Sequence, residues 1–202
     1  MKYKAHPWHG INPGKDLPKL VRCFIEVVPG DQMKYEIDKE SGYLYVDRPN
    51  LYSSSVPLLY GFIPRTYSAE ASAAFCMQQS GLKDLKGDGD PIDVIVLTDR
   101  SVIRGDILVD AYPIGGLRMI DGGETDDKIL AVLKDDQSYG HIGDISEVPD
   151  ALLKRIKHYF LSYKNDPDNN NDHTVYIESE YGPEAAYGVI MAGVKDYEAH
   201  YL

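Results

Sequence analysis

Three aspartates, Asp88, Asp90 and Asp93, lie within six residues in the segment 87–96. An apolar, β-branched run follows, from Ile92 to Leu97. Like charges this close to a buried strand repel one another unless a cation neutralises them. No histidine or cysteine stands nearby, and carboxylate oxygens alone suit hard cations such as Mg²⁺ or Mn²⁺. The segment therefore indicates a divalent-metal site.

Two other interpretations of this segment are open to test. An exposed acidic turn that binds nothing is one, because such turns are common. A calcium-binding EF-hand loop is the other, but its register does not fit. Counting from Asp88, position six is Asp93, where the loop needs glycine, and position twelve is Asp99 rather than glutamate. No amphipathic helices are expected on either side.

A second acidic segment, Asp121–Lys128, also leads into an apolar strand. Alone, it is more typical of a hairpin loop than of a ligand set. Two aspartate-rich loops that each adjoin a strand favour one shared metal cluster.

Basic and phenolic residues complete the candidate chemistry. Each alone is typical of a solvated surface position. Together, beside a metal cluster, ammonium, guanidinium and phenol groups supply the donors that phosphate oxygens require. The residues concerned are Lys34, Arg48, Tyr60, Tyr163 and Lys164.

The elements that must position these residues are mostly strands. Alternation and Val/Ile-rich runs predict strands at 21–28, 33–38, 43–47, 92–97, 107–114 and 129–133. Helices come late: one from an N-cap at Ser146 to about Tyr163, and one from Pro183 to about Tyr197. The polar run 164–172 is expected to be a loop. Closely spaced strands followed by helices predict an α+β, mainly β fold, a small closed barrel with helices packed outside.

The 202 residues suit a single domain, 1–202, with a probable surface insertion and short helix at about 68–86. No apolar stretch of 18 residues exists, so no membrane partner is expected. The net charge of −11 argues against nucleic-acid binding, which needs a basic surface. An N-terminus without an apolar signal segment and two widely spaced cysteines indicate a cytoplasmic setting.

The run DGDPID at 88–93 fits the signature D-[SGDN]-D-[PE]-[LIVMF]-D, and the chain here resembles the soluble inorganic pyrophosphatases of family I. KYEID at 34–38, VDR at 46–48 and Tyr60-Gly61 occur in the family's order. The resemblance implies a five-stranded OB-like barrel and Mg²⁺-dependent hydrolysis of pyrophosphate to two orthophosphates. It also implies a homo-oligomer of the bacterial type, with a hexamer favoured and a dimer or trimer as alternatives.

The resemblance also implies a role for each matching residue. Asp90 would be the general base that acts on a metal-activated water. The metal ligands would be Glu26, Asp88, Asp93, Asp121 and Asp126, with Asp93 bridging two ions. The phosphate oxygens would be held by Lys34, Arg48, Tyr60, Lys128, Tyr163 and Lys164.

The sequence departs from the family pattern at three places. Val56 stands where the family has a tyrosine, Gly122 replaces a frequent acid, and the segment 68–86 is longer than in typical bacterial members. Two rival functions come from other classes: an OB-fold nucleic-acid binder, which the acidic charge opposes, and an inactive calcium-binding or scaffold relative. The second rival predicts loss of phosphate-facing residues, yet Lys34, Arg48, Tyr60 and Tyr163 are present.

Overall fold

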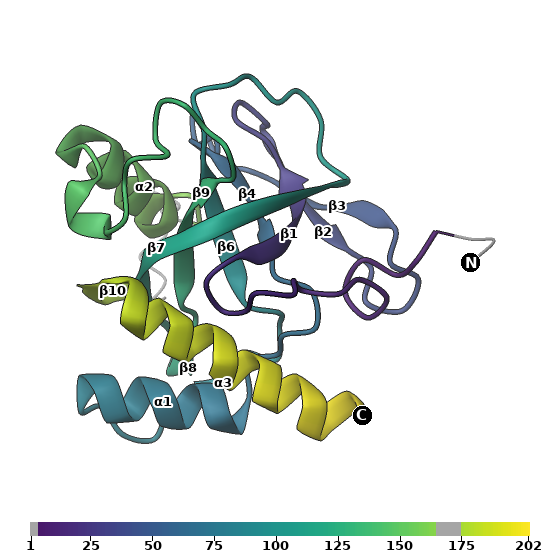
Figure 1. The fold of residues 1–202 in the computed structure, drawn as a ribbon, viewed down its shortest axis with the longest axis vertical. Helices are drawn as coiled ribbons and strands as arrows, with labels where there is room; N and C mark the ends of the chain where they lie inside the picture. The colour runs from purple at the N-terminus through teal and green to yellow at the C-terminus, as the bar shows by residue number, and fades with distance from the viewer. Residues whose placement is uncertain (1–3, 165–174) are drawn as a thin grey trace.

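The computed structural model describes residues 4–164 and 175–202. Within them, strands precede most of the helical structure, as Figure 1 shows. The elements in chain order are β1 (Val21–Val27), β2 (Met33–Ile37), β3 (Leu44–Pro49), β4 (Leu59–Phe62), α1 (Glu70–Ser80), β5 (Lys86–Gly87), β6 (Asp93–Leu97), β7 (Ile107–Asp121), β8 (Glu124–Thr125), β9 (Lys128–Leu133), a 3₁₀ turn (Ile145–Glu147), α2 (Asp150–Ser162), β10 (Val175–Tyr181) and α3 (Pro183–Tyr201).

The main sheet contains a ring of pairings that runs through five strands. Its order is β1-β4-β6-β9-β7, and β7 also pairs with β1. The pairings are antiparallel except that of β6 with β9, which is parallel. Short β8, β5 and β10 extend this sheet from β7, while β2 and β3 form a separate hairpin. The prediction of a mainly β fold is confirmed.

Close approach of β1 and β4 depends on Gly61. A Cβ atom at this position would lie 1.9 Å from the carbonyl oxygen of Phe24 and 2.9 Å from the Cα of Ile25. Only glycine leaves room for the β1 backbone here. The Tyr60-Gly61 pair therefore combines a side chain that points to one face of the sheet with a residue that lets the neighbouring strand approach.

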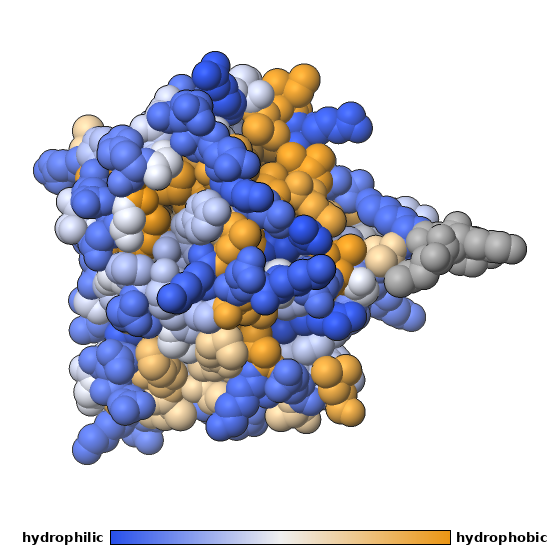
Figure 2. All heavy atoms as spheres, viewed as in Figure 1, coloured by the Kyte–Doolittle hydropathy of each residue, from blue (hydrophilic) through white to orange (hydrophobic). Residues whose placement is uncertain are grey.

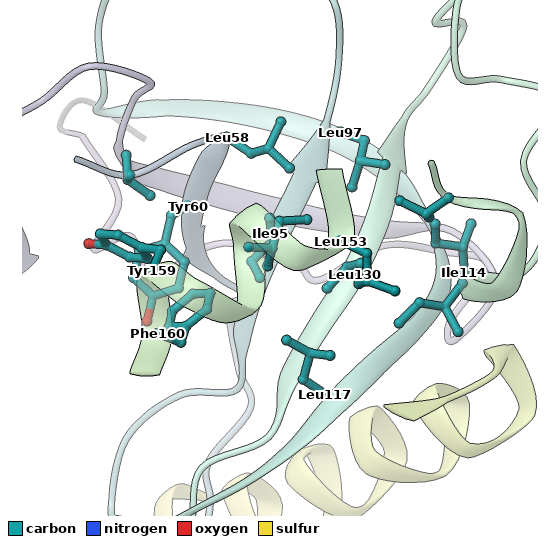
Figure 3. Packing of buried hydrophobic residues seen from close by; sticks show 14 of the residues in the cluster. Leu58, Tyr60, Ile95, Leu97, Ile114, Leu117, Leu130, Leu153, Tyr159 and Phe160 are labelled. Carbon is teal, nitrogen blue, oxygen red and sulfur yellow. The ribbon is translucent and has the colours of Figure 1, made fainter. Parts of the chain in front are cut away.

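One face of the sheet packs against α2. Leu153, Ile156 and Phe160 recur at helical spacing and are all buried. They join Ile95 and Leu130 of the sheet in one apolar cluster, which Figure 3 shows in close view. Because Tyr60 belongs to the same cluster, the packing of α2 also fixes one wall of the site described below.

The other two helices lie side by side, as Figure 1 shows at the bottom of the molecule. The predicted helix within 68–86 is α1, and its Ala73 and Cys76 are buried. The carboxylate of Asp196 on α3 accepts hydrogen bonds from the backbone N–H groups of Ala69, Ala71 and Ser72. These N–H groups have no partner within the helix, so Asp196 anchors the start of α1 to α3. That the segment is an insertion relative to other family members stays a prediction.

The structure differs from the expected elements in several ways. Strand β4, which belongs to the ring, was not predicted, and neither were the short strands β5 and β8. Strand β7 continues to Asp121 rather than ending near 114, and β10 was not predicted although its side chains alternate in exposure. The prediction that Ser146 caps the late helix is wrong. Asp144 instead caps the 3₁₀ turn by accepting the N–H of Ser146, and α2 begins only after Pro149. The loop expected at 164–172 lies, after Lys164, outside the described residues.

The surface agrees with the ordinary charged fraction of 26%. Figure 2 shows mostly hydrophilic residues on the face seen in Figure 1, with hydrophobic groups between them. In the described ranges, no helix is both long enough and apolar enough to cross a membrane.

Candidate active site

A single cleft of about 220 Å³ brings most of the predicted site residues together. Its walls come from β1, β2, β4, the 88–93 loop, the segment around β8 and β9, and the end of α2. The predicted residues that line it are Glu26, Lys34, Tyr60, Asp88, Asp90, Asp93, Asp121, Asp126, Lys128, Tyr163 and Lys164. Arg48 does not line the cleft, but its guanidinium lies 5.9 Å from the ring centroid of Tyr163, which does.

Asp93 occupies the centre of this arrangement. Its Oδ2 accepts a hydrogen bond of 2.7 Å from the hydroxyl of Tyr60 and another from the ammonium of Lys128. The sheet produces this contact directly, because parallel pairing of β6 and β9 sets Asp93 opposite Lys128. The same ammonium also donates to Asp126. The two acidic segments of the sequence therefore meet at one lysine.

Burial and mutual repulsion govern the charges on this wall. Burial, and then the nearby carboxylate of Asp126, raise the pKa of Asp88 to about 8. Burial likewise raises the pKa of Asp126, although Lys128 opposes this. Burial lowers the pKa of Lys128, but Asp126 and Asp93 outweigh it and raise that pKa well above its usual value. On this wall, burial and mutual repulsion therefore disfavour the ionised forms of Asp88 and Asp126.

Asp90 lies at the more open part of the cleft, with about half of its side chain exposed. It forms an ion pair with Lys39, whose ammonium also donates to the carbonyl of Gly89 at 3.2 Å. The loop is held by Ser68, whose N–H donates to the carbonyl of Asp90 at 2.8 Å and whose carbonyl accepts from Gly89. Asp90 thus has a fixed backbone and an accessible carboxylate.

The opposite wall carries cations and phenols. Lys164 donates to Asp121 at 2.6 Å. Lys34 pairs with Glu36, and its ammonium lies 3.6 Å from Asp47. Tyr163 projects from the last turn of the α2 segment, where α2 packs on the sheet. This wall can donate hydrogen bonds to an anion.

Glu26 lies deeper than the other acids, with 7% of its surface exposed. Its Oε1 accepts the N–H of Ile37 at 2.8 Å, which ties β1 to β2. Burial raises the pKa of Glu26 well above its usual value. This carboxylate therefore also supports the fold, a role that the sequence did not indicate.

The carboxylates that line the cleft are the candidate ligands for the expected Mg²⁺. Within residues 4–164 and 175–202, no group of three or more acidic, cysteine or histidine side chains has the arrangement of a formed metal site. Lysines pair with the carboxylates instead, as Lys128 does with Asp93 and Asp126. The chemistry of the set fits Mg²⁺ all the same, because the candidate ligands are carboxylate oxygens, and burial and then repulsion by Asp126 raise the pKa of Asp88, an effect that a bound cation would oppose.

Several residues of the cleft were not predicted. Glu36 lies within the KYEID run at 34–38, Lys39 directly follows it, and Glu124 lies within the second acidic segment, so their positions in the sequence could have suggested them. Trp8 also lines the cleft, although it is far from every motif in the sequence. α1 contributes no residue to the lining.

Two departures from the family pattern have clear local settings. Val56 is 2% exposed and packs in the apolar cluster beneath α2, so no phenol is available there. Gly122 has a φ of +59° at the turn before β8, a left-handed conformation that glycine adopts without strain.

Comparison with known proteins gives one consistent result. The family profile for inorganic pyrophosphatase matches residues 23–198. An inorganic pyrophosphatase of Chlamydia trachomatis is 46% identical over 196 residues, which cover 96% of this chain and 94% of that protein. Soluble inorganic pyrophosphatase 2 of Chlamydomonas reinhardtii is 40% identical and covers 98% of this chain and 91% of its own. The crystal structure of inorganic pyrophosphatase from Thermus thermophilus superposes with a TM-score of 0.79 at 30% identity, covering 96% of this chain and 99% of the other. The chain belongs to the inorganic pyrophosphatase family.

Proposed function

We propose that this cleft hydrolyses inorganic pyrophosphate to two orthophosphates with the help of Mg²⁺. One observation carries the proposal: two aspartate-rich segments and a set of lysine and tyrosine donors line the same cleft in a member of this family. Carboxylates alone would repel a polyanion, whereas carboxylates that hold cations attract it.

The metal ligands in this proposal are the acids of one wall. Asp88, Asp93 and Asp126 would hold the first ion, Asp93 would bridge to a second, Asp121 with Asp126 would bind another, and Glu26 a further one. Bound Mg²⁺ would lower the pKa of a water and offset charge on the phosphates.

The substrate contacts follow from the other wall. Lys34 and Tyr163 face the cleft, and Arg48 lies beside the Tyr163 ring. Lys128 and Lys164 now donate to carboxylates. Once those carboxylates hold cations, both ammonium groups are free to donate to phosphate oxygens. Tyr60 stays protonated, because burial and Asp93 raise its pKa well above the usual value, and it can therefore serve as a donor.

Asp90 is the proposed general base. It is accessible, and its main chain is fixed by Ser68. Its carboxylate would accept the proton of the attacking water as the bond from phosphorus to the bridging oxygen breaks. Attack by water requires no covalent intermediate on the protein.

The remaining expectations rest on the family resemblance. We infer a closed OB-like barrel, which the ring of pairings through β1, β4, β6, β9 and β7 supports. We also infer a cytoplasmic homo-oligomer, with a hexamer favoured over a dimer or trimer.

Phosphate release from pyrophosphate tests the proposal. We expect full turnover with Mg²⁺, none in excess chelator, and inhibition by Ca²⁺, whose larger radius does not suit a site built for a small octahedral ion. Full activity in excess chelator would contradict the proposal, as would no activity at any Mg²⁺ concentration.

A further inference from the structure

Asp127 lies between two cleft residues but faces away from the cleft. Asp126 and Lys128 both line the cleft. Asp127 is buried, with 9% of its surface exposed, and its nearest charged partner is Arg118 of β7. Alternate residues of an extended chain point to opposite sides. The segment that leads into β9 and presents two groups to the cleft therefore carries a buried acid on its reverse side.

The ion pair and the hydrogen bond of this acid lie on the reverse side, although the residue also borders a small cavity shared with Asp88, Asp93 and Asp126. Its Oδ1 lies 3.6 Å from the Nε of Arg118, and its Oδ2 accepts a 3.0 Å hydrogen bond from the hydroxyl of Thr125. Arg118 is 3% exposed, and its guanidinium lies 4.9 Å from the ring centroid of Tyr181 on β10. The pair thus joins β7, β10 and the start of β9 behind the cleft.

This ion pair has little further support. Among the described residues, neither Nε nor Nη2 of Arg118 has a hydrogen-bond partner, and neither does Oδ1 of Asp127. Apart from the Thr125 hydroxyl and the neighbouring Tyr181, each charge therefore depends mainly on the other. Removal of one partner would leave the other buried and uncompensated, which strongly disfavours the packed arrangement.

The Arg118–Asp127 pair constrains the short segment 126–128, which contains two residues of the cleft. The N–H of Asp126 donates to the carbonyl of Met119 at 3.0 Å, one residue beyond Arg118. Lys128 pairs with Leu117, one residue before Arg118. A shift of Asp127 relative to Arg118 would therefore move Asp126 and Lys128 together.

We propose that Arg118 and Asp127 are positioning residues that hold Asp126 and Lys128 in the cleft from behind. The inference rests on the proposed function, since it assigns these residues an effect on Mg²⁺ binding by Asp126. Groups that orient metal ligands without touching the metal typically contribute about 10–100-fold to affinity or activity.

The experiment compares Asp127→Asn, Arg118→Met and the double variant Arg118→Met/Asp127→Leu. Mg²⁺ affinity is measured by calorimetry without pyrophosphate, with kcat, KM and thermal unfolding measured in parallel. Each single variant should bind Mg²⁺ about 10–100-fold more weakly and lose kcat by a similar factor. The double variant, which removes both charges, should recover Mg²⁺ affinity to within a few-fold of wild type.

Asp196→Asn is the matched control, because it makes the same change at a buried carboxylate away from the cleft. It should lower the unfolding temperature while Mg²⁺ affinity stays unchanged. If Asp127→Asn does not fold, Thr125→Val removes one hydrogen bond to Asp127 and should weaken Mg²⁺ binding in the same direction.

Single variants that lose thermal stability but keep wild-type Mg²⁺ affinity and kcat would overturn the inference and leave a purely structural pair. So would a double variant worse than both single variants. If the wild type itself neither binds Mg²⁺ nor releases phosphate, the proposed function fails. If the wild type does both and the single variants behave like it, only the inference about Arg118 and Asp127 fails.

Discussion

Asp88 and Asp196 are both carboxylates withdrawn from solvent, and their partners differ. Asp196 accepts three backbone N–H groups at the start of α1. Among the described residues, Asp88 accepts a single backbone N–H, that of Asp90 at 3.1 Å, and burial followed by repulsion from the nearby aspartates raises its pKa to about 8. One acid is satisfied by the fold, and the other is left in a repulsive group.

This difference separates a carboxylate that anchors the fold from carboxylates that can bind a cation. A carboxylate with a full set of N–H donors stabilises the fold and has no further need of a cation. Carboxylates that repel one another destabilise the protein alone and gain most when a cation enters. The two kinds of acid should therefore respond oppositely to metal, to pH and to substitution.

The largest effect is expected for Asp93→Ala. This change removes the acceptor shared by Tyr60 and Lys128 and the proposed bridge between two ions. Phosphate release should fall by more than the roughly 10²–10⁴-fold typical of losing a general base. A variant that retains even a tenth of wild-type turnover would show that Asp93 is not central to the cleft.

Asp90→Asn should have the next largest effect. The amide keeps the shape of the side chain but cannot accept a proton. Turnover should fall by roughly 10²–10⁴-fold while Mg²⁺ affinity and KM change little. Steady-state kinetics with parallel Mg²⁺ titration measure this. Near-normal turnover, or Mg²⁺ binding as weak as in Asp93→Ala, would rule out Asp90 as the base.

The stability of the metal-free protein should depend on pH through Asp88. Its pKa is about 8 when folded and near 3.8 when unfolded, so between these values the folded state binds the extra proton. This contribution to stability is present at low pH and is lost as the pH rises toward 8. In chelator, Asp88→Asn should therefore gain unfolding temperature relative to wild type between pH 5 and 8. Parallel thermal melts test this, and a constant difference across that range would contradict it.

The smallest effect on activity is expected for Asp196→Asn. The variant weakens the N–H contacts that join α1 to α3 and should cost about 1–3 kcal/mol. For a chain of this size that corresponds to roughly 2–4 °C in Tm per kcal/mol. Turnover should stay within about two-fold of wild type, since α1 does not line the cleft. A large loss of turnover at temperatures where the variant is folded would contradict the separation of the two regions.

The sequence allowed much of the cleft to be predicted, because its acids lie in two dense local motifs. Asp88, Asp90 and Asp93 mark one segment, and Asp121 and Asp126 the other. We could expect the two segments to share one site because each is a loop that adjoins a strand. The contact between Lys128 and Asp93 could not be predicted, because it depends on parallel pairing of β6 with β9 across 35 residues.

The remaining misses have similar physical causes. The reverse-side pair of Arg118 and Asp127 depends on the antiparallel pairing of β7 with β9, and no local pattern reports this. Trp8 reaches the cleft through tertiary packing of the N-terminal segment. Strand β10 had a weak signal, since the apolar Val175 and Ile177 are two residues apart and glutamates follow, but the polar run before it suggested a loop.

The most direct test is a calorimetric titration of Mg²⁺ into the metal-free wild type, Asp93→Ala and Asp196→Asn, without pyrophosphate. The account predicts equal Mg²⁺ affinity for wild type and Asp196→Asn, and loss of binding in Asp93→Ala. Wild-type affinity in Asp93→Ala, or an equal loss in both variants, would contradict the claim that the repulsive acids of the cleft, and not buried acids in general, hold the metal.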